Sequence, residues 1–140
     1  MANEATVLVE GTAKSIVREF TVADGTAIPK GTLMVYDTAT RTAVAHGVSA
    51  VNKTERPLGF ATTEKEANDG KTTIGLQRTG VVDAWNDGGV ATGDLVGLGT
   101  TANRVRGLYG AVSIYQEIWF GRALETGATA TQVKIALALG

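Results

Sequence analysis

Short apolar runs recur along the chain and alternate with polar, glycine-rich stretches. In the final run, Val133, Ile135 and Leu137 fall on one face of an extended chain, whereas Lys134 and Ala136 fall on the other. This period of two is typical of a β-strand with one buried face. Comparable runs predict strands at 15–22, 32–36, 42–45, 57–62, 72–82, 94–98, 104–105, 117–125 and 131–139. The pattern predicts a mainly β protein with no helix longer than about three turns.

Two segments interrupt this β pattern. In the segment 63–70, Thr63 can cap a helix, Glu66 follows three residues later and Gly70 can end it, which predicts one short helical turn. The segment 107–115 shows no clear alternation and predicts either a loop or a short helix.

The chain contains an internal repeat, in which the residue numbers of matching positions differ by a constant offset of 62. Gly31-Thr32-Leu33 aligns with Gly93-Asp94-Leu95, and Gly59-Phe60-Ala61 aligns with Gly121-Arg122-Ala123. The last predicted strands, 73–76 and 132–135, align at an offset of 59 because the second copy lacks three residues in the preceding loop. We therefore expect an N-terminal extended arm over 1–14 and one β domain over 15–140, built from two repeated units at about 27–82 and 89–140. Because a lone hairpin is marginal in water, the two units are expected to share a core as a small barrel or sandwich.

Composition and charge narrow the class of protein. The 140 residues predict one domain, and 13 basic against 14 acidic residues give a formal net charge of −1, which argues against a general nucleic-acid binder. The chain has no cysteine, which excludes a disulfide framework and fits folding in a reducing cytoplasm. The N-terminus lacks the basic start and apolar core of a signal peptide, and no apolar run approaches membrane-spanning length, so we expect no membrane partner.

Reactive side chains are sparse. His46 is the only histidine, so one chain cannot supply a zinc site with several histidines, and we expect His46 in a loop or an interface. The acidic cluster Glu64, Glu66 and Asp69 lacks the ligand order of an EF-hand and is expected to be a solvated loop. We therefore expect no catalytic residue, no cofactor, no metal site and no enzymatic activity.

Aromatic residues and the N-terminal arm are the candidates for partner contacts. Trp85 adjoins a predicted turn, and core and interface roles are equally open for it, whereas Trp119 and Phe120 are expected in the core. The extended N-terminal segment can add a strand to an exposed sheet edge of a partner and become ordered as it docks. The candidate contacts with a partner or a second subunit are Thr6, Val7, Leu8, Val9, Trp85, Tyr109 and Tyr115.

Five short motifs follow one another along the chain. They are Ile28-Pro29-Lys30-Gly31-Thr32-Leu33, Pro57-Leu58-Gly59-Phe60-Ala61, Gly80-Val81-Val82, Gly93-Asp94-Leu95-Val96 and Gly121-Arg122-Ala123-Leu124-Glu125. In this order they resemble bacteriophage capsid cement proteins, which are also called head decoration proteins. The resemblance covers roughly residues 15 to 140, and the segment 107–120 departs from it as an insertion in the second unit.

The resemblance implies a small β-rich structural protein of the virion, commonly a homotrimer and without catalytic activity. Such a protein binds the major capsid protein on the outer surface of the expanded head and stabilises the shell against the pressure of the genome. Two other classes stay open. One is a carbohydrate-binding or adhesive β-module of a phage fibre or tail, in which Trp85, Trp119 and a tyrosine line an exposed platform. The other is an accessory β-domain of an enzyme, or a small enzyme whose site forms between subunits.

Overall fold

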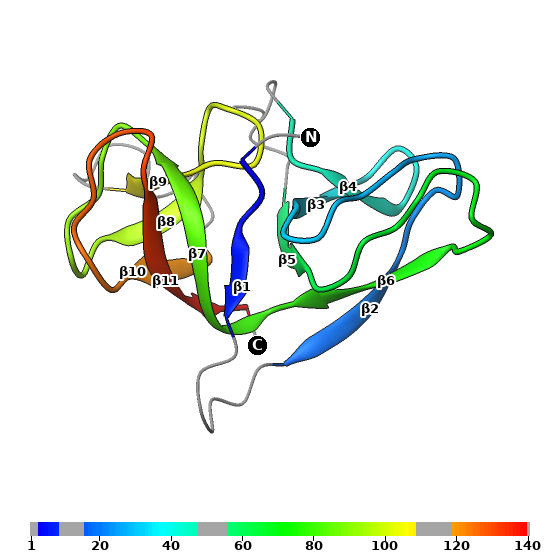
Figure 1. The fold of residues 1–140 in the computed structure, drawn as a ribbon, viewed down its shortest axis with the longest axis horizontal. Helices are drawn as coiled ribbons and strands as arrows, with labels where there is room; N and C mark the ends of the chain where they lie inside the picture. Colours follow the sequence, from blue (N-terminus) through cyan, green and yellow to red (C-terminus); the bar gives the residue numbers. More distant parts are fainter. Residues whose placement is uncertain (1–2, 9–15, 48–55, 109–118, 140) are drawn as a thin grey trace.

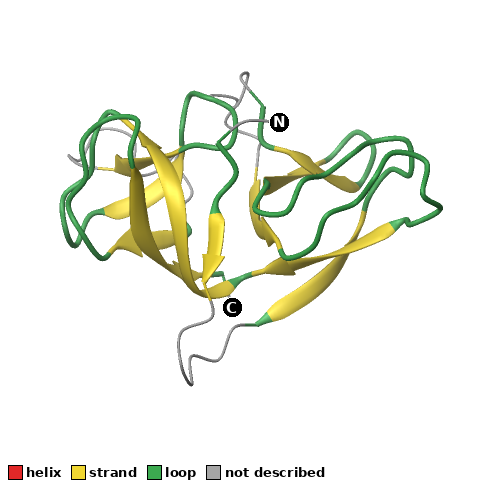
Figure 2. Ribbon diagram, in the orientation of Figure 1, coloured by secondary structure: helices red, strands yellow, loops and turns green. Residues whose placement is uncertain are grey.

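The computed structural model describes residues 3–8, 16–47, 56–108 and 119–139 and contains eleven β-strands and no helix over these residues (Figures 1 and 2). The prediction of a mainly β protein is therefore confirmed. No helix in the described part of the chain has the length and apolar character needed to cross a membrane. The strands are β1 (Thr6–Leu8), β2 (Val17–Thr21), β3 (Leu33–Asp37), β4 (Thr42–Ala45), β5 (Arg56–Ala61), β6 (Thr73–Gln77), β7 (Thr79–Asp87), β8 (Leu95–Leu98), β9 (Val105–Leu108), β10 (Gly121–Ala123) and β11 (Gln132–Ala138).

The strands form two sheets that lie side by side (Figure 1). The first sheet has the order β2-β6-β5-β3-β4, and its neighbouring strands are antiparallel. The second sheet has the order β7-β11-β10-β8-β9 and closes on itself through a short parallel pairing of β7 with β9, at Asn86 with Val105 and Asp87 with Arg106. These five strands make a barrel, and β1 lies antiparallel to β7 on its outer edge.

The first sheet and the barrel share one strand order, with β2, β6, β5, β3 and β4 matching β7, β11, β10, β8 and β9. An isolated bridge joins Ile28 to Lys65 beside the first sheet, and another joins Val90 to Gly127 beside the barrel, so both ends of the bridge repeat at the offset of 62. The correspondence includes β2 and β7, so the matching halves run over 17–77 and 79–138. It supports the repeat that the sequence suggests, and the duplication itself stays a prediction.

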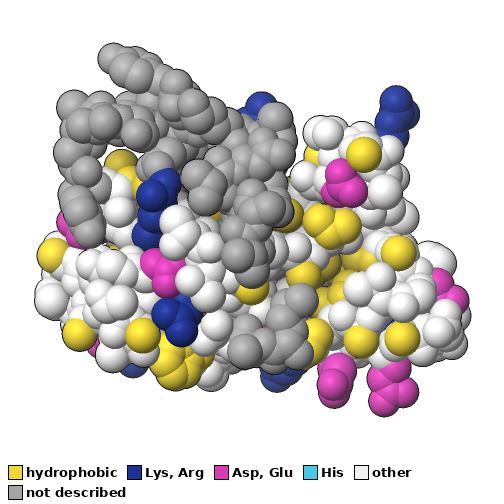
Figure 3. All heavy atoms as spheres, turned by 90° about the horizontal axis from the view of Figure 1, so that it is seen from above, with side chains coloured by type: hydrophobic (Ala, Val, Ile, Leu, Met, Phe, Trp, Pro, Cys, Tyr) yellow, Lys and Arg dark blue, Asp and Glu magenta, His cyan; other side chains and the backbone are white. Residues whose placement is uncertain are grey.

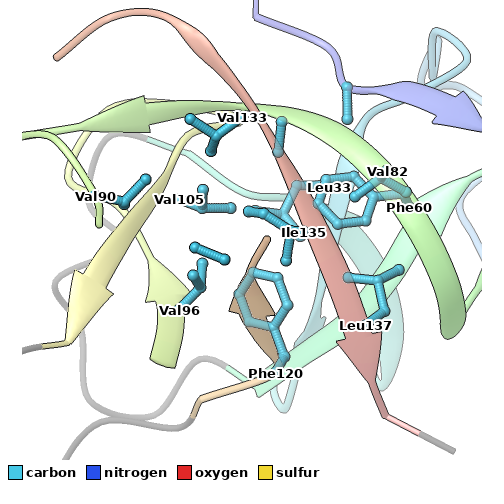
Figure 4. Packing of buried hydrophobic residues seen from close by; sticks show 13 residues of the cluster. Leu33, Phe60, Val82, Val90, Val96, Val105, Phe120, Val133, Ile135 and Leu137 are labelled. Carbon is cyan, nitrogen blue, oxygen red and sulfur yellow. The ribbon is translucent and has the colours of Figure 1, made fainter. Parts of the chain in front are cut away.

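Side chains of the first sheet contribute to two cores because successive residues of a strand point to opposite faces. Met34 and Ala61 lie in the core of the first sheet, whereas their neighbours Leu33 and Phe60 join the core of the barrel. In that core the Phe60 ring lies 6.2 Å from the ring of Phe120, measured between centroids, in a tilted arrangement (Figure 4). The remaining members of the barrel core come mainly from β7, β8, β9, β10 and β11. The first sheet and the barrel, which are called the two bodies below, are thus packed together through buried apolar side chains.

Three local predictions are wrong. The segment 63–70 forms no helical turn, because Lys65 pairs with Ile28 and the following residues make a turn. The predicted strand 72–82 is two strands that separate at Arg78, whose guanidinium turns to the carbonyls of Leu58 (2.8 Å) and Leu139 (3.1 Å). Trp119 is 48% exposed, although Phe120 beside it is fully buried as expected.

Candidate binding surfaces

Residues 3–8 of the N-terminal arm are docked on the barrel of their own chain. Thr6, Val7 and Leu8 pair with Asp83, Val82 and Val81 of β7, and the Gln132 amide donates to the Thr6 hydroxyl at 3.3 Å. Before the strand, the arm lies against the barrel at Asn3, which Arg104 contacts at 3.4 Å. Of the residues that the sequence suggests for partner contacts, Thr6, Val7 and Leu8 therefore lie on the edge of β7.

Ala5 connects this arm to the first sheet. Its side chain is buried in the barrel core, and its amide donates to the carbonyl of Gly31 at 2.7 Å. Gly31 has a φ of 86°, in the left-handed region, and a Cβ added there would overlap the carbonyl oxygen of Ala5. The glycine thus permits both the turn before β3 and the close approach of the arm. The arm therefore lies in contact with both bodies.

Trp85 lies on the same outer face as the docked arm. It is half-buried on β7 opposite Gln132, two residues beyond Asp83, so it shares a face with Asp83 and with Thr6, which pairs with Asp83. The structure thus places Thr6 and Trp85 on the same face of the neighbouring strands β1 and β7. Val9, Tyr109 and Tyr115, the other suggested contacts, lie outside the described residues.

Lys65 is a buried charge that sequence reasoning missed. Its side chain is 1% exposed, and its ammonium donates to the carbonyls of Asp24 (2.6 Å), Glu66 (3.0 Å) and Thr26 (3.3 Å). It also forms an ion pair with Asp69 at 3.2 Å. A hydrogen bond from the Lys71 amide holds the pKa of Asp69 below its usual value, and Lys65 acts in the same direction, although desolvation opposes both. The acidic loop is thus organised by the chain's own cation, while Glu64 and Glu66 are solvent-exposed as expected.

In the barrel, Asn86 binds loop carbonyls as Lys65 does beside the first sheet. Asn86 is fully buried near the end of β7, and its Nδ2 donates to the carbonyls of Ala128 and Thr131, both at 2.8 Å. Its Oδ1 accepts from the Gly89 amide at 2.8 Å. Gly127 stands at the position of Lys65, where a side chain would meet Val133. A buried amide therefore binds the loop carbonyls of the barrel where the first sheet uses an ammonium.

Buried hydrogen bonds fix how the first sheet and the barrel lie against each other. Asn103 Oδ1 accepts from the Leu33 amide at 3.1 Å, and His46 Nε2 donates to the Gly99 carbonyl at 2.9 Å. His46 lies in the loop after β4, one of the two places expected for it, and is buried against the barrel. Such contacts need a fixed geometry because a buried donor without its acceptor costs about 1–3 kcal/mol.

Ion pairing accounts for one of the arginines of the barrel. Arg104 contacts Asp87 at 3.3 Å near the β7–β9 closure. Partial burial raises the pKa of Asp87, but hydrogen bonds from the Thr101 amide, the Thr100 hydroxyl and Arg104 outweigh it and hold the pKa below its usual value. The geometry is that of a structural contact. Within the described ranges, no group of three or more His, Asp or Glu side chains is placed to hold a metal.

The exposed apolar surface is divided between the two bodies. Viewed from above, apolar side chains gather between the bodies and over the first sheet, and acidic side chains project from its rim (Figure 3). The large apolar side chains that are exposed among the described residues are Ile16 (36%), Val17 (49%), Trp119 (48%) and Leu124 (47%). Two of these four, Ile16 and Val17, are consecutive and lie at the start of β2.

Comparison with known proteins bears on the fold. Among the solved structures that are similar to this chain is the N base of the head fiber gp8.5 of bacteriophage phi29, with a TM-score of 0.55 over 89% of this chain and 97% of that chain. The fold is similar to that of a phage head fiber base. The sequence identity is 15%, so the likeness is one of fold. No protein-family model matches the chain, and no curated protein matches it.

Proposed function

We propose that this chain is a structural protein of a bacteriophage head, which binds the outer surface of the expanded shell and stabilises it as a cement protein. The observation that carries the proposal is the fold likeness to a head fiber base, which extends over 89% of this chain and so includes both bodies. The motifs that resemble cement proteins support it separately, since they lie in both halves of the sequence. The protein acts by binding and has no catalytic role.

The packing of the two bodies suits a protein that joins neighbouring subunits. Phe60 and Phe120 pack across the junction, and Asn103 and His46 fix its register, so a load on one body passes to the other. The proposed partner is the major capsid protein, and the proposed assembly on the head is a homotrimer. Three linked contacts bind with avidity, because after the first contact the others are effectively intramolecular.

The proposal is tested by sedimentation with expanded, empty heads of the phage whose genome encodes this chain. We expect the purified protein to sediment with expanded heads and to saturate at a stoichiometry that matches the three-fold positions. Unexpanded heads are the matched control, because a cement protein binds the outer surface only after expansion. A protein that stays in the supernatant with expanded heads contradicts the proposal.

A fibre-base role is the second candidate, and the comparison favours it because the matched structure is itself described as the base of a head fiber. The two candidates differ in one measurement: a cement protein is expected to raise the temperature at which the shell ruptures, and a protein that serves only as a fibre base is expected to leave it unchanged. A carbohydrate-binding module of a fibre or tail is separated from both by a glycan-binding screen, with Trp85→Ala and Trp119→Ala as the variants that remove its aromatic platform.

A further inference from the structure

The strand β2 is an open edge of the first sheet. Among the described residues it pairs with β6 alone, and it follows the lower border of the first sheet in Figure 1. Val17 on this edge is 49% exposed and Ile16 before it is 36% exposed. An exposed edge strand readily pairs with another chain unless charges, proline or a covering element block it. The exposed charges on β2, Arg18 and Glu19, therefore restrict which strand can pair there.

The hydrogen bonds of β2 show which backbone groups face outward. Arg78 N donates to Ile16 O at 2.8 Å, and Val22 N donates to Thr72 O at 2.9 Å, so the even-numbered residues of β2 direct their amides and carbonyls at β6. The odd-numbered residues Val17, Glu19 and Thr21 direct theirs away from β6. These outward amides and carbonyls can accept an added strand.

The corresponding edge in the barrel, on β7, pairs with another strand. Asn86 N donates to Thr131 O at 3.1 Å, which matches the bond from Val22 to Thr72 and aligns β2 with β7 at an offset of 64. Val17 then corresponds to Val81, and Glu19 corresponds to Asp83, an apolar and an acidic residue in both strands. Val81 and Asp83 are paired with Leu8 and Thr6 of β1. The edge that β1 covers in the barrel therefore corresponds to an edge of β2 on which, within the described part of the chain, no strand pairs, although β4 comes close to β2.

We propose that the β2 edge is an acceptor for an antiparallel strand of the phage shell protein, an inference that rests on the proposed function. The pairing on β7 gives the chemistry of the incoming strand. An aliphatic residue faces Val17, as Leu8 faces Val81, and a hydroxyl or cationic side chain faces Glu19, as Thr6 faces Asp83. Main-chain hydrogen bonds supply affinity and the alternate side chains supply specificity.

A second copy of the chain fits this edge less well. Symmetric pairing of two β2 strands over all five residues places Glu19 against Glu19 of the other copy, and the register centred one residue earlier places Arg18 against Arg18. Like charges directly opposite each other are destabilising. A β1 strand from a second copy cannot fill every edge either, because each chain has two such edges and one β1. Symmetric pairing centred on Val17 or on Phe20 opposes no like charges, so a second copy is kept as an outcome of the test, and the strand is assigned to the shell protein as the partner of the proposed function.

A proline substitution at Glu19 tests a single outward amide of the β2 edge. Glu19→Pro removes an outward amide and leaves the β6 ladder intact, whereas Glu19→Ala removes the same side chain and keeps the amide. We expect Glu19→Ala to bind expanded heads within about threefold of the unchanged protein and Glu19→Pro to bind about tenfold more weakly, which is the loss of one hydrogen bond of about 1.4 kcal/mol. Circular dichroism and thermal unfolding establish that each variant is folded.

Hydrogen exchange gives a second measurement and does not need the proline variant to fold. In the head-bound protein we expect the amides of Val17, Glu19 and Thr21 to exchange at least about tenfold more slowly than in the free protein, while those of Arg18 and Phe20 are already protected by β6. The inference is overturned if Glu19→Pro and Glu19→Ala bind heads equally well, or if exchange of the outward amides does not change on binding. The proposed function is upheld in either case as long as the unchanged chain binds heads. Protection that rises with protein concentration without heads assigns the edge to a second copy and also overturns the inference. Failure of the unchanged chain to bind heads overturns the proposed function itself.

Discussion

Replacing Lys65 with methionine tests how the acidic loop is held. The substitution keeps the apolar stem and removes an ammonium that is almost fully buried and donates to the carbonyls of Asp24, Glu66 and Thr26. Each hydrogen bond to a charged group is worth about 1.5–3 kcal/mol, and such terms do not add fully because water can reach part of the loop. We expect a loss of about 3 kcal/mol in the free energy of unfolding, the lower end of what breaking a buried ion pair costs.

The assay is thermal and urea unfolding followed by circular dichroism. For a chain of this size a loss of about 3 kcal/mol lowers the Tm by about 10 °C. Lys71→Met is the matched control, since Lys71 is exposed in the same loop, and we expect it to change stability by no more than about 0.5 kcal/mol. If Lys65→Met and Lys71→Met unfold within about 1 °C of each other (about 0.3 kcal/mol), the reasoning about the buried ammonium is refuted.

Three further outcomes are expected. Gly31→Ala destabilises the protein more than Gly93→Ala in equilibrium unfolding, since both glycines have a positive φ but only the added Cβ at residue 31 meets the arm; equal losses contradict a docked arm. Phe120→Ala costs about 3–5 kcal/mol by the same assay, whereas Trp119→Ala costs less than about 1 kcal/mol because its side chain is half exposed; the reverse order contradicts the packing. Asp87 has a lowered pKa in the folded state, so its contribution is present above its unfolded pKa of about 3.9 and is lost as the pH falls through its folded pKa. Urea unfolding from pH 6 to pH 2 is expected to show a shallower decline for Asp87→Asn, and parallel curves refute this assignment.

The sequence predicted most of the strands because one-sided burial leaves a period of two. The final strand is the clearest case, with Val133, Ile135 and Leu137 buried as the alternation indicates. The structure then shows isolated bridges beside the two bodies at the same offset of 62, which the sequence did not predict. The sequence also missed the match between β2 and β7, because Val17-Arg18-Glu19 and Val81-Val82-Asp83 align at 64 and share few identities.

Other features depend on tertiary contacts that no local pattern records. Lys65 lies between two glutamates in a polar segment, which is typical of a solvated loop, and only the carbonyls of a distant turn make it buried. The helical turn expected from Thr63, Glu66 and Gly70 is prevented by the pairing of Lys65 with Ile28. The signal that could have located Lys65 is the repeat itself, since Gly127 is its counterpart and the position therefore lies close to the core.

For the N-terminal arm, the sequence predicted an extended segment but not the strand with which it pairs. An extended segment near the N-terminus was expected, and Thr6–Leu8 is a strand. The sequence gives no indication that this strand pairs with β7, because Thr-Val-Leu fits any open sheet edge. Its docking also means that removing residues 1–10 is expected to lower stability, since Ala5 leaves the core.

The rupture temperature of expanded heads is the measurement that tests the central claim most directly. Heads that lack their outer protein are heated with and without a saturating amount of this chain, and release of their DNA is followed by the fluorescence of an intercalating dye. A cement protein raises the rupture temperature by several degrees, roughly in proportion to the number of sites filled, because binding to the intact shell alone stabilises it by mass action. An unchanged rupture temperature at full occupancy contradicts the cement role.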